Sequence, residues 1–173
     1  MQAHTFYKVI TMDQANLLER LVALFDEHGI QYCVIGGQAV NAYAEPLVSL
    51  DLDIVIAADQ LLEVEALLER SFQVKRFAHS LIVSTPDSDL RVQIQTDPRH
   101  KDFPSRAQVR EVLGTRLKVA ALEDVLQGKV WAAQDSERRG SKRQKDLADI
   151  ARLIEVHPEL RASVPDEILK RLV

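Results

Sequence analysis

The feature that most constrains the fold is a pair of glycines directly after a short apolar run. Residues 32–35 have the composition of a buried strand, and Gly36 and Gly37 end it. Residues 38–44 are rich in alanine and predict a short helix that ends before Pro46. Residues 50–57 are again mostly apolar and predict a strand. The sequence therefore predicts a strand–turn–helix–strand unit early in the chain.

Two carboxylates mark the second strand of this unit. Residues two apart on a strand point to the same face, about 6.5 Å apart, so we expect Asp51 and Asp53 to project together. Neighbouring ionised carboxylates repel each other, and burial increases the cost. A hard divalent cation removes the conflict, and Mg²⁺ accepts carboxylates together with substrate phosphates. The alternative interpretation is a solvated edge strand, where an Asp-x-Asp pattern needs no ligand.

The glycine pair suits an anion. Glycine lets backbone amides approach a phosphate closely, and the N-terminus of a helix favours negative charge. Taken alone, Gly36-Gly37 is typical of a tight turn. A phosphate cradle beside a metal-binding carboxylate pair indicates metal-assisted phosphoryl or nucleotidyl transfer.

The rest of the chain predicts an α+β protein. We expect a helix capped by Asp13, and another capped by Asp59 with Leu61, Leu62, Ala66 and Leu68 as apolar positions. Strands are predicted at 72–77, 80–84, 90–95 and 117–119, and helices from 121 onward, with a polar interruption at 135–144 and a short last helix after Pro165. The predicted fold is a mixed β-sheet flanked by helices, with C-terminal helices packed on it. We divide the chain into a sheet core, residues 1–119, and a helical part, residues 120–173, packed as one unit.

Together these motifs resemble a known family. Gly36-Gly37, a spacer and Asp51-Leu52-Asp53 look like the signature of the DNA polymerase beta-like nucleotidyltransferase superfamily. Lys129, followed by Arg143, Lys145-Asp146 and Asp149, is similar to a motif of its small bacterial AbiEii-like members, the abortive-infection toxin group. The resemblance spans roughly residues 30 to 155. It implies a sheet flanked by helices, Mg²⁺, and transfer of a nucleoside monophosphate from an NTP to a hydroxyl or phosphate.

The resemblance also implies roles for individual residues. Asp51 and Asp53 would be the catalytic, metal-binding pair, and Gly36 and Gly37 would contact the triphosphate. The resemblance also implies that Ser49 and Lys129 bind the nucleotide. The implied partners are an NTP, an RNA, protein or small-molecule acceptor, and an antitoxin-like protein. A homodimer is a further alternative.

The sequence departs from the family at the third carboxylate, which belongs on a later central strand. The expected position is Gln93, with Gln95 as the second choice, and neither side chain carries a charge. The nearest acids, Asp89 and Asp97, lie four residues from Gln93, about 13 Å along an extended strand. The glycine pair and the two aspartates still make a Mg²⁺-dependent nucleotidyltransferase the leading hypothesis. The alternatives are a catalytically weak or inactive module that binds nucleotide or a partner, and a scaffold that binds partners through its C-terminal helices.

Composition limits the remaining choices. The chain has 173 residues, a net charge of −4 and a single cysteine, Cys33, so an intrachain disulfide is excluded and a basic sheath for duplex nucleic acid is not expected. No run approaches the ~18 apolar residues of a membrane helix. The first eight residues lack the pattern of a signal peptide, which predicts a cytoplasmic protein.

Several other side chains lie near these motifs. Arg99 and His100 either serve the site from a loop or belong to an ordinary polar turn, and Trp131 is either a helix contact or a surface for a base. We interpret the basic cluster as a solubilising loop, with contact to RNA or phosphates as the alternative. Its members are Arg138, Arg139, Lys142, Arg143 and Lys145.

Overall fold

A seven-stranded mixed sheet forms the centre of the protein. The computed structural model describes residues 16–112 and 114–172, so the predicted cap Asp13 lies outside the described residues. The strands run in the order β3-β4-β5-β2-β1-β7-β6. In chain order they are β1 Tyr32–Ile35, β2 Asp51–Ile56, β3 Gln73–Phe77, β4 Ser80–Ser84, β5 Arg91–Gln95, β6 Gln108–Val112 and β7 Thr115–Val119. β2 pairs parallel with β5 and antiparallel with β1, which in turn pairs parallel with β7.

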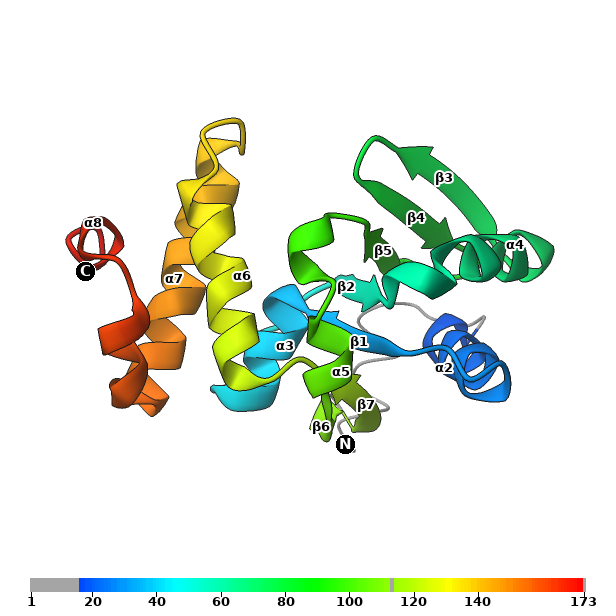
Figure 1. The fold of residues 1–173 in the computed structure, drawn as a ribbon, viewed down its shortest axis with the longest axis horizontal. Helices are drawn as coiled ribbons and strands as arrows, with labels where there is room; N and C mark the ends of the chain where they lie inside the picture. Colours follow the sequence, from blue (N-terminus) through cyan, green and yellow to red (C-terminus); the bar gives the residue numbers. More distant parts are fainter. Residues whose placement is uncertain (1–15, 113, 173) are drawn as a thin grey trace.

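The helices lie around this sheet (Figure 1). The α-helices are α2 Leu17–Glu27, α3 Gly36–Tyr43, α4 Leu61–Ser71, α5 Phe103–Arg106, α6 Leu122–Gln134, α7 Gly140–Val156 and α8 Asp166–Leu169. The 3₁₀ helices are η1 Ala58–Gln60, η2 Pro98–His100 and η3 Pro158–Ser163. Within the described residues, no helix is long and apolar enough to cross a membrane.

The two faces of the central strands differ in chemistry because side chains alternate along a strand. One face carries Tyr32, Ile54 and their neighbours, which are buried, and Phe25 of α2 contacts the Tyr32 ring at 5.2 Å between centroids. The opposite face carries Ile35, Asp53 and Gln93, which share a register across β1, β2 and β5. The sheet thus has an apolar face for the core and a partly polar face left for a ligand.

The C-terminal helices pack together and against the sheet domain, as the sequence predicts. α6 and α7 lie side by side, and both contact α3 (Figure 1). Tyr43 of α3 donates a hydrogen bond to the carbonyl of Ala120, 2.7 Å away, just before α6 begins. Leu147, Ile150 and Leu153 form the buried stripe of α7. The division of the chain after residue 119 remains a prediction.

The predicted strand–turn–helix–strand unit is present, and several other expectations need correction. α3 begins at Gly36, so the glycines open the helix. Leu62, predicted to be a core position of α4, is 82% exposed, because the helix buries Val64, Glu65 and Leu68 instead. Asp59 lies inside η1 and caps no helix with its side chain. The sequence analysis missed β6, and residues 140–144 are helical, so the interruption between α6 and α7 spans only 135–139.

Candidate functional site

The two predicted metal-binding carboxylates lie on β2 in the central part of the sheet. In register, Asp51 pairs with Arg91 on β5, and Asp53 pairs with Gln93 on β5 and with Ile35 on β1. Both aspartates are partly buried, while Leu52 and Ile54 between and after them are buried in the core. The alternation therefore directs both aspartates to the same face. β2 has a neighbour on each side, so the alternative of a solvated edge strand is wrong.

Gly36 and Asp53 are in intimate contact. Gly36 has φ +70°, a left-handed conformation that favours glycine. A β-carbon added there would collide with Oδ2 of Asp53 and lie 3.2 Å from its Cβ and Cγ. Gly37 has no such constraint, because a β-carbon there would meet nothing within 4 Å. The missing side chain at Gly36 is thus what lets the Asp53 carboxylate sit at the start of α3.

The start of α3 offers backbone donors to an anion. Amides in the first turn of a helix have no intrahelical acceptor. The residue before the helix, Ile35, supplies no side-chain cap. Free amides and the positive end of the helix dipole therefore face the Asp53 end of the site.

Opposing electrostatic effects act on the carboxylate of Asp53. Burial raises the pKa of its carboxyl, and the charge of Asp51 raises it further, while Lys129, Arg138 and Lys142 lower it. Within the described residues, no donor or cation is close enough to bond to this carboxylate. A partly buried carboxylate without a partner beside a second carboxylate suits a hard divalent cation. Asp51 and Asp53 thus fit Mg²⁺ as two of its ligands.

Beyond Asp51 and Asp53, the described residues supply no cluster of charged side chains as further metal ligands. In residues 16–112 and 114–172, no group of three or more His, Cys, Asp or Glu side chains is placed to hold a metal. Gln93 is the side chain that the register sets beside Asp53, and its amide oxygen is neutral. A cation bound here therefore depends on two carboxylates, water and the oxygens of a substrate.

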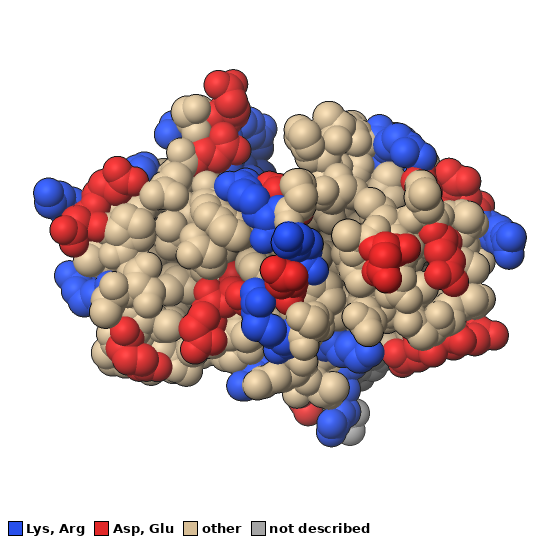
Figure 2. Space-filling model, in the orientation of Figure 1, with Lys and Arg blue, Asp and Glu red and all other residues tan. Residues whose placement is uncertain are grey.

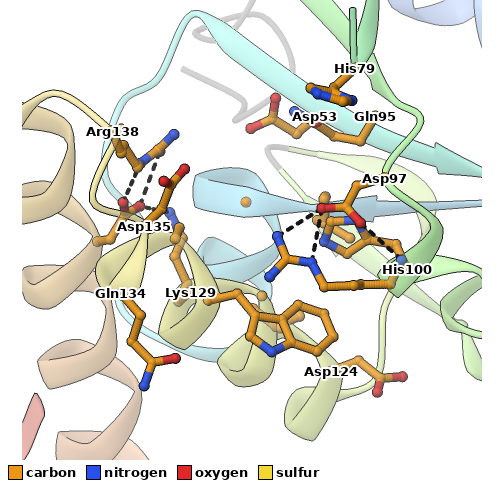
Figure 3. Close-up of a pocket in the computed structure, with 18 of the residues that line it drawn as sticks. Asp53, His79, Gln95, Asp97, His100, Asp124, Lys129, Gln134, Asp135 and Arg138 are labelled. Atoms are coloured by element: carbon orange, nitrogen blue, oxygen red, sulfur yellow. Dashed lines mark hydrogen bonds and ion pairs between the residues drawn. The ribbon is translucent and has the colours of Figure 1, made fainter.

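A cleft of about 620 Å³ opens in front of Asp53. Ile35, Gly36, Asp53 and Gln95 line it from the sheet, residues 97–100 from the loop after β5, and the Asp124–Asp135 side of α6 from the helical part. Figure 3 shows Lys129 and Arg138 on one side of this cleft and Asp97 with His100 on the other. Figure 2 shows the hollow between the helical pair and the sheet, with basic side chains along the middle of this face. Its volume is within the range of small-molecule sites.

Lys129 is held in place by the motif that the sequence analysis singled out. Its Nζ lies 3.1 Å from Oδ1 of Asp146 and 2.8 Å from Oδ2 of Asp149, and all three side chains are buried. Arg138 adds an ion pair to Asp146, with 2.6 Å between Nε and Oδ2, and Arg152 adds one to Asp149. Three cations share two carboxylates, so the cluster keeps a net positive charge beside Asp53.

Other predicted residues occupy different positions. Ser49 does not line the cleft; its Oγ hydrogen-bonds with the backbone of Asp51 just before β2. Lys145 is exposed, away from the cluster that its neighbour Asp146 joins. Asp97 lines the cleft but is held by Arg99, which donates two side-chain bonds of 3.0 and 2.7 Å. Trp131 and His100 also line the cleft, so the loop after β5 is part of its wall.

The sequence analysis missed several residues of the cleft. Arg138, assigned to a solubilising loop, lines the cleft and pairs with Asp146, so that assignment is wrong for this residue. His79, Gly128 and Asp135 also line it. The spacing Asp124–Gly128–Trp131–Asp135, one face of a helix, was a signal available in the sequence.

Comparison with known proteins identifies the fold. No protein-family model matches the chain, and no curated protein matches its sequence. The crystal structure of ANT(2'')-Ia in complex with adenylyl-2''-tobramycin superposes with a TM-score of 0.59 at 14% identity, over 92% of this chain and 99% of that one. The lincomycin-bound lincosamide antibiotic adenylyltransferase LnuA gives 0.53 at 12% identity, over 79% and 95%. An antigenic nucleotidyltransferase-like protein from Paracoccidioides brasiliensis gives 0.53 at 20% identity, over 86% and 75%.

These similarities establish the fold. The chain has the mixed sheet and flanking helices of the nucleotidyltransferases, which confirms the fold class predicted from the sequence. The particular resemblance to AbiEii-like proteins remains a prediction.

Proposed function

We propose that this protein is a Mg²⁺-dependent nucleotidyltransferase that moves a nucleoside monophosphate from an NTP to an acceptor. The observation that carries the proposal is the contact between Asp53 and Gly36, which brings to the first turn of α3 a carboxylate that bonds to none of the described residues. A carboxylate pair for a cation and free helix amides for a polyphosphate thus meet in one place. Among the structural neighbours above, LnuA is named an adenylyltransferase, and ANT(2'')-Ia was solved with an adenylylated antibiotic.

Each proposed site residue has a distinct role. Asp51 and Asp53 hold Mg²⁺, with the amide oxygen of Gln93 as a neutral neighbour. The cation, when bound, neutralises the phosphates and makes the α-phosphorus more electrophilic. The amides at Gly36 and Gly37 bind the triphosphate. Lys129 supplies fixed positive charge to the same region, and Ser49 orients the strand that carries Asp51.

A second function is favoured by the pairing of Asp53 with Gln93. The position beside the metal-binding pair has no charge, so the site lacks the acid that would take the acceptor's proton. Loss of such help typically lowers turnover by about 100-fold or more. The alternative is therefore a catalytically weak or inactive module that binds nucleotide or a partner protein.

The proposal also covers the class of acceptor and the biological role of the protein. ANT(2'')-Ia and LnuA are named with tobramycin and lincomycin products or ligands, which makes a small molecule the first acceptor class to test, before RNA or protein. We further propose a cytoplasmic bacterial protein with a toxin-like role and an antitoxin-like partner, on the resemblance of Lys129, Asp146 and Asp149 to the AbiEii-like motif. A homodimer belongs to the same set of proposals.

Thermal unfolding tests the nucleotide site. The wild-type protein is compared with Asp51→Asn/Asp53→Asn, with and without Mg²⁺ and each NTP. A ligand at roughly 100 times its Kd adds about 2.7 kcal/mol, which raises the Tm of a chain of this size by about 5–10 °C. We expect a Mg²⁺-dependent rise that the double variant loses. Asp87→Asn, in the exposed turn before β5, is the matched control and should keep it.

Turnover separates the two functions. Incorporation of label from an α-labelled NTP, or release of pyrophosphate, supports the enzyme if it disappears in Asp51→Asn. Binding without turnover supports the inactive module. If no NTP shifts the Tm of the wild-type protein, the nucleotide site itself is refuted.

A further inference from the structure

The surface of α6 that faces the cleft contains a glycine that the packing of the helix does not require. Gly128 lies in the middle of the helix, where glycine costs about 1 kcal/mol relative to alanine. A β-carbon at Gly128 would meet nothing within 4 Å, so no packing requires its absence. Gly128 and Ala132, one turn later, both line the cleft. The small side chains leave space for a ligand to lie against the helix.

One edge of this space is a flat aromatic platform. The rings of Trp131 and Phe103 are 6.0 Å apart and within 9° of parallel. The guanidinium of Arg99 lies 4.9 Å from the centroid of the Trp131 ring, and its bonds to Asp97 fix it there. Trp131 remains partly exposed. Phe103 and Arg99 thus hold the indole in place, and its exposed part forms a rigid aromatic section of the cleft wall.

A buried polar atom at the same edge lacks a partner. His100 lines the cleft, is only 9% exposed, and makes edge contacts with Trp131 and Phe103. Its Nδ1 is buried without a hydrogen-bond partner among the described residues. Burial also lowers the pKa of the His100 ring, which favours its neutral form. The cleft wall at this edge therefore contains one polar ring atom that no described residue satisfies.

We propose that Gly128, Trp131 and Ala132, together with Arg99 and His100, form the subsite for the nucleobase of the NTP. The inference rests on the proposed function and specifies how the nucleotide lies. The triphosphate occupies the side of Gly36, Lys129 and Arg138, and the base lies on the aromatic side. Figure 3 shows Lys129 and Arg138 on one side of the cleft and His100 on the other.

Two carboxylates beside the aromatic rings are already held in ion pairs. The two acidic side chains here already have partners: Asp97 is paired with Arg99, and Asp124 with Arg106 at 2.8 Å. A third carboxylate of the lining, Asp135, lies one turn beyond Trp131 and makes no ion pair with a described residue. A flat heteroaromatic ring gains from stacking and from hydrogen bonds at its edge, and needs no counter-charge.

Trp131 is the only tryptophan in the sequence, so its fluorescence reports on this subsite directly. The wild-type protein is titrated with ATP, GTP, CTP and UTP, and with inorganic tripolyphosphate, all in the presence of Mg²⁺. We expect at least one NTP to change the Trp131 emission at saturation. Tripolyphosphate should compete with that NTP but leave the emission nearly unchanged.

Variants measured by calorimetry give the second readout. Trp131→Leu should weaken the NTP by about tenfold or more, while its affinity for tripolyphosphate stays the same. Trp131→Phe, which retains an aromatic ring, should recover most of the affinity. Gly128→Ala should raise the Tm and weaken the NTP by about fivefold or more, because the methyl group fills the cleft. Gly140→Ala, which also meets open space but lies outside the cleft, is the control and should leave binding unchanged.

The outcomes separate this inference from the proposed function. If an NTP binds with Mg²⁺ through Asp51 and Asp53, but Trp131→Leu and Gly128→Ala bind it normally, the base lies elsewhere and the inference is overturned. The same holds if an acceptor, and no NTP, changes the Trp131 emission. If no NTP or tripolyphosphate binds at all, the proposed function fails first.

Discussion

Asp53 and Gln93 are register partners on the adjacent parallel strands β2 and β5. The pairing places a neutral amide beside a carboxylate whose pKa is already raised by burial and by Asp51. A third acid there would increase the repulsion in the absence of a cation and strengthen the site in its presence. The residue at position 93 therefore affects both the stability of the protein without a cation and its capacity for catalysis with one.

Gln93→Glu tests that balance. We expect the variant to raise Mg²⁺-dependent turnover by about tenfold or more, because it supplies the missing charge for metal and proton. Its Tm in a chelator should fall, since a third carboxylate joins Asp51 and Asp53. Gln73→Glu is the matched control, because Gln73 is exposed at the start of the edge strand β3, outside the cleft. Turnover that stays the same or drops in Gln93→Glu, measured with labelled NTP, would show that the missing charge at this position does not limit catalysis.

The two glycines should respond differently to alanine. At Gly36 the left-handed backbone costs about 1–2 kcal/mol, and displacing Asp53 costs about 1–3 kcal/mol more. At Gly37, where a β-carbon meets open space, alanine should change stability by no more than about 0.5 kcal/mol. Urea unfolding of both variants measures the difference. Equal losses at the two positions would show that Gly36 and Asp53 are not in the contact described.

Since a β-carbon at Gly37 meets open space, we expect Gly37→Ala to stay folded and to weaken binding of tripolyphosphate at the start of α3. A weakened affinity for tripolyphosphate in this variant would come from the added methyl group at the start of α3. Unchanged affinity would exclude Gly37 from the phosphate site.

The buried ion cluster should be sensitive to the loss of its central cation. Lys129→Met leaves Asp146 and Asp149 buried with less compensation, which typically costs about 3–5 kcal/mol. Lys145→Met removes an exposed lysine from the same motif and should change stability by about 0.5 kcal/mol or less. Chemical denaturation of the two variants decides the point. A mild effect of Lys129→Met would mean that Arg138 and Arg152 suffice to compensate the carboxylates.

Cys33 should be inert in the native state. Its side chain is fully buried on β1, and burial raises the pKa of the thiol to about 12. Reaction with a thiol reagent at pH 8 should therefore be limited by unfolding of the chain, and fast in urea. Between about pH 9 and pH 12 the unfolded thiol ionises and the native one does not, so this group lowers stability as pH rises. Rapid labelling under native conditions would contradict the burial of β1.

The sequence alone determined the local unit and its chemistry. The apolar run, the break at Gly36 and the spacing of Asp51 and Asp53 were sufficient because strand alternation and glycine backbone preferences act within a few residues. The strands at 80–84 and 90–95 followed for the same reason. β6 escaped notice because it is an edge strand whose residues are mostly exposed, so its pattern lacks the apolar signal of a core strand.

Only the tertiary structure decided which residues meet. The pairing of Asp53 with Gln93 depends on the register of β2 with β5, across a connection of 34 residues that includes α4, β3 and β4. Lys129 meets Asp146 and Asp149 because α6 and α7 pack side by side, and Arg138 joins them from the loop between. The cleft forms where α6 faces the polar side of the sheet. The spacing of residues in the sequence determines which side chains lie on the same face of a strand or helix. Which faces contact each other depends on the packing of elements that are far apart in the chain.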